Sequence, residues 1–376
     1  MNFLKNDTAG NVTLEVWVYD YFDTDTYPSG EVEIIDKATG EVVGRIPSIE
    51  SKKTNVTLSI DKIGEYELSI EYKGSQYHNP VNNTETITVV GRSSETQATI
   101  ENNTYGNTSI TVTVKDPETK QIIANAPITI TLPNGTNINS NTGNTGTINI
   151  PVDIPVGPNT ITVEFNGDDT YNTSTKSIDT TILQRQSETT ATITNSSIRN
   201  VTVNVTVHDK TTGTIISSGE VEILDNNGNT VGTGSIDTTG LAIITTNINS
   251  KDITELIVNY LGNTNYTSST YTINDLAVTG RLSDINYTVN NNTYNNISIN
   301  VTVIDPITNT AVPDAPITIT YPDGTTETVT TDNNGNYTIT HDMPVGENTI
   351  TVEFTGTDEY NSTTKTYTFT VDMRES

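Results

Sequence analysis

The sequence has 376 residues, of which 46 are acidic and only 18 are basic, giving a formal net charge of -28. This charge excludes nucleic acid and anionic lipid as partners, because both bind through clustered Lys or Arg. The absence of cysteine excludes disulfides and thiolate metal sites. Only 32% of the residues are apolar, but they alternate with Thr and Asn, which is typical of half-buried strands and not of disorder.

The first repeated element along the chain is an alternating strand that ends on Asp. Its four copies are Leu14, Val16, Val18 and Asp20; Ile110, Val112, Val114 and Asp116; Val203, Val205, Val207 and Asp209; and Ile299, Val301, Val303 and Asp305. Alternation of this kind predicts strands with one buried face. A period near 94 residues that recurs four times predicts a tandem repeat.

A second marker follows later in each copy, where a strand ends in an aromatic residue, any residue and Gly, and a second aromatic comes next. The four copies are Tyr72, Gly74 and Tyr77; Phe165, Gly167 and Tyr171; Tyr260, Gly262 and Tyr266; and Phe354, Gly356 and Tyr360. The glycines are spaced by 93, 95 and 94 residues. Two markers in phase predict four copies of one domain.

The copies also alternate in type. The first and third share Ser-Gly-Glu-Val-Glu-Ile at 29–34 and 218–223, and the second and fourth share Ala-Pro-Ile-Thr-Ile-Thr at 126–131 and 315–320. Both pairs lie 189 residues apart. The pattern indicates that a two-domain block was duplicated as a whole.

Within each copy, short alternating strands are separated by Asn- and Gly-containing turns every 8–14 residues. The sequence therefore predicts an all-β chain of four tandem immunoglobulin-like β-sandwich domains in an extended array, with almost no helix. Arginines at regular spacing mark the boundaries: Arg92, Arg185, Arg281 and Arg374. The predicted domains are 1–91, 92–184, 185–280 and 281–376.

Both ends of the sequence fall in phase with the repeat. Aligning Asn11 with Asn107 makes Met1 equivalent to Gln97, so the first strand of the first domain is predicted to be truncated. Arg374 stands where a fifth domain would begin. These positions predict that the chain is an excerpt from a longer array.

The sequence around these aromatic and glycine markers resembles the bacterial-type Ig-like domain repeats of large surface proteins. The run Phe165-Asn166-Gly167-Asp168-Asp169-Thr170-Tyr171 is the copy most similar to that pattern. The Thr-, Asn- and Ile-rich, acidic and cysteine-free character is similar to the adhesin-like cell-surface proteins of methanogenic archaea. The resemblance covers the whole chain and implies the Ig-like fold and a place in a cell-surface array.

Catalysis needs titratable groups that converge at one place, and here the carboxylates recur with the repeat. The three histidines, His78, His208 and His341, occupy unrelated positions in their domains. The sequence therefore predicts a non-enzymatic protein with no zinc site and no organic cofactor.

Calcium is the metal hypothesis that the sequence allows, because hard carboxylate oxygens suit this ion. The turn after the second strand and the turn between the last two strands are expected at the same end of each domain. The candidate ligands are Asp116, Asp168 and Asp169, with Glu95 from the linker, and Asp305, Asp358 and Glu359, with Asp284. The alternative is that these Asp residues cap turns or pair with the boundary Arg.

The first domain has a run rich in aromatic and acidic residues next to the only tryptophan. The candidate ligand-binding residues are Trp17, Tyr19, Tyr21, Phe22 and Tyr27. The parity of Val16 and Val18 with the core positions of other domains places Trp17 and Tyr19 on the opposite face. Exposed aromatics beside carboxylates favour a sugar or protein partner; the alternative is that this face packs against the loop or a preceding domain.

Asn-x-Ser/Thr sequons recur on the predicted strands and turns, and glycosylation candidates are Asn11, Asn55, Asn107, Asn204, Asn300 and Asn361. The function predicted from these observations is an extracellular, cell-surface stalk that projects a binding region or contributes to adhesion. Its expected partner is a glycan or protein on another cell, and the chain itself is expected to be monomeric. The alternatives are a specific glycan- or protein-binding module in the first domain and a self-assembling surface-layer component.

Overall fold

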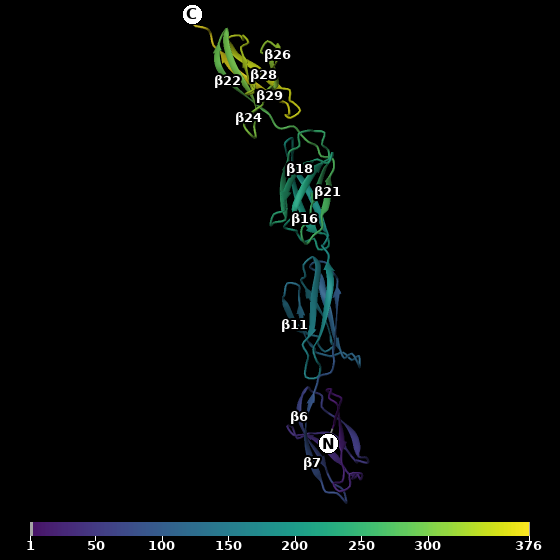
Figure 1. Ribbon diagram of the computed structural model, residues 1–376. Coiled ribbons are helices and arrows are strands. Elements are labelled where there is room, and N and C mark those ends of the chain that lie inside the picture. Colours follow the sequence, from purple (N-terminus) through teal and green to yellow (C-terminus); the bar gives the residue numbers. More distant parts are fainter. Residues whose placement is uncertain (1–2, 376) are drawn as a thin grey trace. The chain divides into compact units, whose positions relative to one another are not determined.

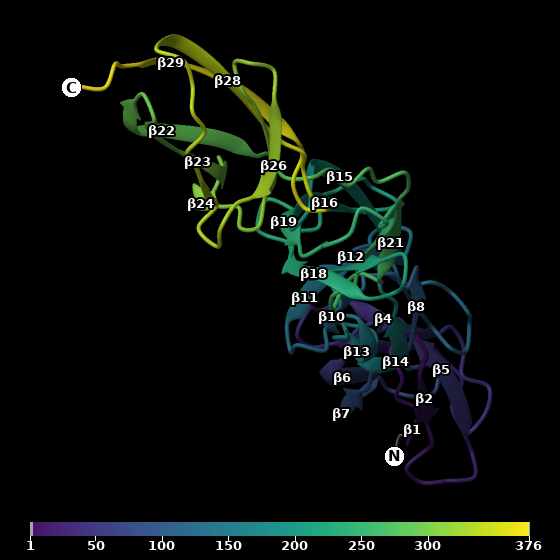
Figure 2. The same ribbon diagram turned by 90° about the horizontal axis from the view of Figure 1, so that it is seen from above.

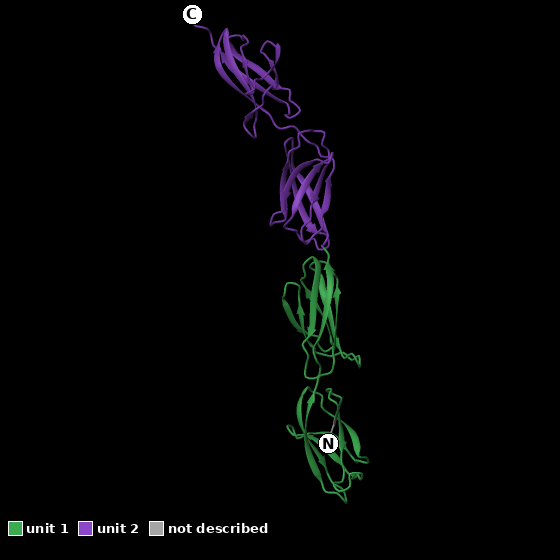
Figure 3. Ribbon diagram, viewed as in Figure 1, with its two compact units in different colours: residues 1–183 green, residues 184–376 purple. Residues whose placement is uncertain are grey.

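The computed structural model describes residues 3–375. Over this range the chain forms strands and turns, and Figure 1 accordingly shows arrows without coiled ribbons. No helix capable of crossing a membrane occurs among these residues. The expected all-β, immunoglobulin-like fold is confirmed. By compactness the chain divides into two units, residues 1–183 and 184–376 (Figure 3), each holding two sandwiches. The four exact domain boundaries stay predictions.

Each sandwich consists of two antiparallel sheets. In the first sandwich, one sheet has the order β1 (Phe3–Asn6), β2 (Val12–Trp17), β5 (Lys53–Leu58), and the other has the order β4 (Val42–Ile46), β3 (Val32–Asp36), β6 (Gly64–Tyr72), β7 (Val81–Val89). In the second, the sheets are β12 (Thr147–Val152), β9 (Thr108–Lys115), β8 (Glu95–Glu101) and β11 (Asn137–Asn141), β10 (Pro127–Thr131), β13 (Gly157–Phe165), β14 (Ser174–Ile182).

The second unit repeats this arrangement. In the third sandwich, the sheets are β15 (Ser187–Ser197), β16 (Asn200–Asp209), β19 (Leu241–Thr246) and β18 (Thr230–Ser235), β17 (Glu220–Asp225), β20 (Leu256–Tyr260), β21 (Ser269–Ile273). In the fourth, β22 (Asp284–Thr293) pairs with β23 (Asn296–Asp305), which also pairs with β24 (Thr310–Ala311) and β27 (Asn336–Ile339). The facing sheet is β26 (Thr326–Thr330), β25 (Pro316–Thr320), β28 (Gly346–Phe354), β29 (Thr363–Val371). Figure 2 shows these two layers, with β22 and β23 in one and β28 and β29 in the other.

The alternating strands bury one face as the sequence predicts. Along β9, Ile110, Val112 and Val114 are fully buried, while the Thr residues between them are half-buried. Each sandwich has its own apolar core between its two sheets. The alternation of apolar and polar residues is enough to bury one face of each strand, because successive side chains of a strand point to opposite faces.

The glycine of the second marker marks a tight turn with a left-handed backbone. All four, Gly74, Gly167, Gly262 and Gly356, have φ between 77° and 87°. In the second sandwich the Asp168 amide donates to the Tyr171 carbonyl across this turn, four residues after Gly167. In the first sandwich the equivalent bond runs from the Ser75 amide to the His78 carbonyl. The sequence comparison that matched Tyr77 with Tyr171 is therefore wrong by one residue, and His78 is the structural counterpart.

The alternation of domain types has a packing cause. In the third sandwich, Gly219 has φ 120°, and a Cβ there would lie 2.4 Å from Cε2 of Tyr260. The hydroxyl of Tyr260 donates to the Ser218 carbonyl at 3.0 Å, and the first sandwich has the same arrangement. In the second sandwich the corresponding pair is Ala126 and Phe165, both fully buried. A tyrosine thus goes with glycine and a phenylalanine with alanine.

Replacing Gly219 by Ala tests this packing, with Gly228→Ala as the matched control. Gly228 also has a positive φ, of 81°, but a Cβ there meets nothing within 4 Å. We expect Gly228→Ala to cost about 1 kcal/mol of unfolding free energy through backbone strain. Gly219→Ala should cost about 3 kcal/mol, because overpacking against Tyr260 is added. Equal urea midpoints for the two variants would contradict the packing argument.

Candidate functional site

A buried aspartate closes the second strand of three sandwiches. Its backbone follows or ends β9, β16 and β23, and its side chain is at most 2% exposed in Asp116, Asp209 and Asp305. One carboxylate oxygen accepts two amide hydrogens of the following turn; for Asp116 these come from Glu118 and Thr119, at 2.8 and 2.9 Å. The aspartate is thereby fixed by the turn that it caps.

The other carboxylate oxygen of each aspartate faces the boundary arginine. Arg92 Nη2 lies 2.5 Å from Asp116 Oδ2. Arg281 pairs with Asp305 in the same way, and Arg185 contacts both oxygens of Asp209, with Nη2 3.0 Å from Oδ1. We call each such pair of arginine and aspartate an arginine clasp, together with the turn between the last two strands that binds the arginine backbone. A charge buried this deeply requires a partner, because desolvation of an unpaired carboxylate is expensive.

The arginine backbone is also held, by the turn between the last two strands. The Arg92 amide donates to the Thr170 carbonyl, and the Asn172 amide donates to the Arg92 carbonyl, both at 2.9 Å. Arg185 and Arg281 form the same pair of bonds in their sandwiches. The guanidinium of Arg92 lies 5.6 Å from the centroid of the Tyr171 ring, within cation–π range. The clasp therefore joins the linker, the second strand and the last turn of one sandwich.

The electrostatics of the clasp favour the ionised aspartate. Burial raises the pKa of Asp116, but the amides of Thr119 and Glu118 and the Arg92 charge outweigh burial, so this pKa lies below its usual range. The pKa of Asp209 is also lowered: burial raises it, and Arg185 with the turn amides more than compensates.

A row of hydroxyls locks the first strand to the last strand just beyond the clasp. Ser94 Oγ lies 2.8 Å and Thr96 Oγ1 2.7 Å from Ser174 Oγ. The third sandwich repeats the lock with Ser187 and Thr189 on Ser269, at 2.7 Å each. The sequence analysis did not predict these hydroxyl contacts. The signal that could have found them is the recurring Arg-x-Ser at the boundary arginines.

In the first sandwich, no arginine among residues 3–375 contacts the strand-closing aspartate. Its strand-closing Asp20 caps the amides of Phe22 and Asp23 and lies 3.3 Å from His78 Nε2. The counterpart tyrosine of the second sandwich likewise donates its hydroxyl to Asp116, at 3.4 Å. Among residues 3–375, His78 is the one basic side chain within 4 Å of the Asp20 carboxylate.

Most of the carboxylates predicted as calcium ligands have protein partners. Asp116 and Asp305 pair with arginine, which is the alternative that the sequence left open. Asp168 caps the Thr170 and Tyr171 amides. The remaining pairs are Asp169 with Lys62 at 3.2 Å, Glu359 with Arg281 and Arg199 at 3.3 Å, Glu95 with Lys115 at 3.5 Å and Asp284 with Lys365 at 2.6 Å. Asp358 lies on the same turn as Glu359. Across the described residues, no three His, Asp or Glu side chains gather in a metal-binding group.

The predicted aromatic group of the first sandwich separates into two parts. Trp17 is half-buried, donates from Nε1 to Glu15 and lies under Lys53, whose Nζ is 3.8 Å from the ring centroid. Tyr21 and Phe22 are 86% and 94% exposed and meet edge to face at 5.4 Å. Tyr19 and Tyr27 are exposed by about half.

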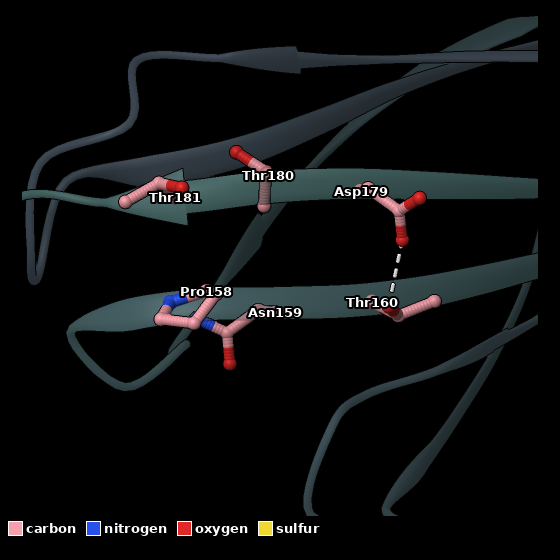
Figure 4. A pocket seen from close by; sticks show the side chains of 6 residues that line it. All are labelled: Pro158, Asn159, Thr160, Asp179, Thr180 and Thr181. Carbon is pink, nitrogen blue, oxygen red and sulfur yellow. Dashed lines mark hydrogen bonds between the residues drawn. The ribbon is translucent and has the colours of Figure 1, made fainter.

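A hollow of about 530 Å³ opens beside these aromatics. It lies between the end of β2 and the strands β3, β6 and β7. Its lining includes Val18, Tyr19, Tyr72 and Val81. A second, shallower hollow lies on β13 and β14 of the second sandwich (Figure 4), where Thr160 donates to Asp179 at 2.7 Å. That surface carries Thr, Asn and Pro beside a single acid.

The glycosylation candidates differ in the freedom of their side chains. Asn11, Asn55 and Asn107 are exposed. The Asn361 side-chain amide donates to the Gly280 carbonyl at 2.9 Å, and that of Asn300 donates to Asn336 at 3.1 Å. Asn204 is half-buried. The first three are therefore the positions best suited to carry a glycan.

Comparison with known proteins gives a partial family match. Residues 298–374, in the fourth sandwich, match the family described as carboxypeptidase regulatory-like domain. No curated protein matches the sequence. A crystal structure of a tetra-tandem repeat in the extending region of a large adhesion protein aligns at 16% identity, over 99% of this chain and 98% of that one, with a TM-score of 0.39.

A cryo-EM structure of E. coli alpha-2-macroglobulin in its native conformation aligns at 11% identity, over 98% of this chain and 28% of that one. Its TM-score is 0.20. Both scores are below 0.5, so the assignment of the fold rests on the sheets and cores described above.

Removing the arginine of one clasp should destabilise its sandwich. We expect Arg92→Ala to lower the unfolding free energy by about 3 kcal/mol, because Asp116 stays buried without its partner. Arg92→Lys should recover part of this loss, since it restores the charge without the planar guanidinium. Arg374→Ala is the control, because Arg374 is exposed. Thermal melting that shows Arg92→Ala to be as stable as Arg374→Ala would contradict the role of the clasp.

The clasp also predicts a pH dependence. Because the pKa of Asp116 is lower in the folded chain than in the unfolded chain, its carboxylate stabilises the fold above roughly pH 4, the unfolded value. This contribution is lost as the pH falls through the folded pKa. The stability advantage of the natural chain over Asp116→Asn should thus be constant near neutral pH and shrink in acid. Urea midpoints measured over this range test it, and an advantage that grows in acid would refute it.

Proposed function

We propose that the chain is a non-enzymatic, load-bearing region of a cell-surface protein, a stalk that holds a binding region or contributes to adhesion. The observation that carries the proposal is the arginine clasp, which recurs with the same residue types at the start of three sandwiches. Catalytic sites require one set of converging groups, whereas this chain repeats a structural joint.

The linker between the two sandwiches of one compact unit is short. Val90 leaves the first sandwich hydrogen-bonded to the segment around Asp7 and Ala9, and Arg92 enters the second sandwich held by its clasp. Only Gly91 lies between these anchored positions. Further contacts connect the two sandwiches, including the bond from the Ile63 amide to the Asp169 carbonyl at 2.7 Å. A joint this short and this well bonded suits the transmission of tension.

The direction of the bonds supports the same function. The entry segment at Arg92 runs parallel to the strand segment at Tyr171, and the hydroxyls of Ser94 and Thr96 tie it to the start of β14. Tension along the chain would shear these parallel segments past each other. Several bonds must then break together, which resists extension better than opening them one at a time.

An alternative function is suggested by Tyr21 and Phe22. Large aromatic side chains exposed this fully on a loop are candidates for partner recognition. This binding function would be added to the stalk and would be confined to the first sandwich. Titration with a linear glucose hexasaccharide, followed by the emission of Trp17, tests this binding function.

Single-molecule stretching of the whole chain tests the load-bearing function. We expect four separate unfolding events, each lengthening the chain by roughly 30 nm, the extended length of about 94 residues less their folded size. In Arg281→Ala one event should move to a lower force, and in Arg374→Ala none should. Extension without distinct force peaks would refute the proposal.

A further inference from the structure

The turn between the first two strands of each sandwich ends on an asparagine, with a hydroxyl residue two positions later. The four runs are Asn11-Val12-Thr13, Asn107-Thr108-Ser109, Asn200-Val201-Thr202 and Asn296-Ile297-Ser298. Each is an Asn-x-Ser/Thr sequon, the acceptor of N-linked sugars. Only Asn11 and Asn107 were among the candidates predicted from the sequence, and Asn200 and Asn296 complete the series in the other two sandwiches.

The positions around these sequons differ between the copies. The residue before the asparagine is Gly10, Gly106, Arg199 or Asn295. The strand residue two positions after the hydroxyl residue is Glu15, Thr111, Asn204 or Asn300. Asparagine and hydroxyl therefore recur in all four copies although their neighbours have diverged.

The asparagine side chain has no part in holding this turn. The left-handed backbone of each turn belongs to the residue before the asparagine, with φ of 75°, 66°, 55° and 58° in the four copies. Among residues 3–375, none of the four side-chain amides forms a hydrogen bond. The sequon amides of Asn300 and Asn361, by contrast, donate to Asn336 and to the Gly280 carbonyl. The fold thus leaves the reactive amide of the turn asparagine unengaged.

Each of these sequons presents its two acceptor residues on the outer face of the sheet. The middle residues are at most 4% exposed: Val12, Thr108, Val201 and Ile297. Because successive side chains alternate in direction, the asparagine and the hydroxyl residue point away from the core. Asn11, Asn107 and Asn296 are exposed, and Asn200 is half-buried.

The turn lies beside the segment through which the chain leaves the sandwich. Its amides donate to that segment at 2.9–3.0 Å, from Ala9 to Val90, from Tyr105 to Leu183, from Ile198 to Thr279 and from Tyr294 to Asp372. Each acceptor stands two positions before a boundary arginine. A sugar on the turn asparagine would therefore stand at the exit end of its sandwich, next to the linker.

We propose that Asn11, Asn107, Asn200 and Asn296 are acceptors of N-linked glycosylation, one at the exit end of each sandwich. In this transfer the asparagine Nδ2 attacks C1 of a diphosphate-activated sugar. The Nδ2–C1 bond forms, the C1–O bond breaks, the diphosphate leaves with the bonding electron pair, and the amide loses one proton. The cell supplies the activated sugar and the transferase, so the inference rests on the surface location given under the proposed function.

The test is glycosylation of the full folded chain by a soluble N-glycosyltransferase that reads Asn-x-Ser/Thr, with UDP-glucose as the donor. Peptide mapping by mass spectrometry locates the added hexose. We expect it on Asn11, Asn107 and Asn296, with lower occupancy on the half-buried Asn200. Asn300 is the matched control, because this sequon lies on the same strand as Asn296 and its amide is bonded. Equal occupancy of Asn296 and Asn300 would overturn the proposal.

A pair of variants tests whether the sequon itself is read. Ser298→Ala should abolish modification of Asn296 and leave that of Asn107 unchanged, whereas Ser298→Thr should preserve both. Modification of Asn296 that persists in Ser298→Ala would contradict the assignment of the turn as a sequon site.

Peptide mapping of the chain isolated from the cells that make it completes the test. Sugar is expected on the turn asparagines, and four unmodified asparagines would overturn the inference. That result would not change the force peaks on stretching, so it is distinguishable from failure of the load-bearing function.

Discussion

The pairing of a buried aspartate with an arginine from the preceding linker is the constraint on which the other features depend. Asp116 follows a strand whose side chains fill the core. One of its carboxylate oxygens accepts hydrogen bonds from two amides of the turn after that strand. The second oxygen is buried and charged, so a cation must reach it. That cation is Arg92, which lies in the linker before the first strand of the sandwich. Each sandwich with a clasp therefore depends on the linker that precedes it.

This dependence explains the composition of the linker inside each unit. Gly91 and Gly280 precede the arginines, and a Cβ at either would lie within 2.4 and 2.5 Å of Oδ1 of Asn172 and Asn361. Those two asparagines donate their side-chain amides back to the glycine carbonyls. A side chain at the glycine would displace this contact. The linker is thus packed as tightly as an element of the sandwich, which is what a joint under tension requires.

Local patterns were enough to predict the strands and turns. The core positions of β9 follow from alternation, and the turns follow from the Asn and Gly residues between the strands. The clasp was left open between calcium and arginine, because carboxylate spacing alone does not show which cation lies opposite Asp116. The Tyr72 and Tyr260 hydroxyl bonds could not be predicted, since their acceptors lie more than 40 residues away.

The error at Tyr77 has a related cause. A comparison of residue types matched tyrosine to tyrosine, although Tyr77 lies one position earlier in a turn of the same length. The backbone bonds instead align His78 with Tyr171. His78 contacts Asp20 as Tyr171 contacts Asp116, so the substitution keeps the polar contact and changes the side chain. Function in a turn follows the hydrogen-bonded register and not the residue type.

The residues that lead into the clasps alternate in type, as the copies of the sequence repeat do. Glycine precedes arginine at 91–92 and 280–281, whereas Gln184 precedes Arg185 and donates to the Asn263 carbonyl at 2.7 Å. Each linker is therefore matched to the turn of the sandwich that it enters, Gly with Asn172 or Asn361 and Gln with Asn263. A stretch of 189 residues, the spacing of the shared sequence runs, therefore contains one linker of each kind with its own receiving turn.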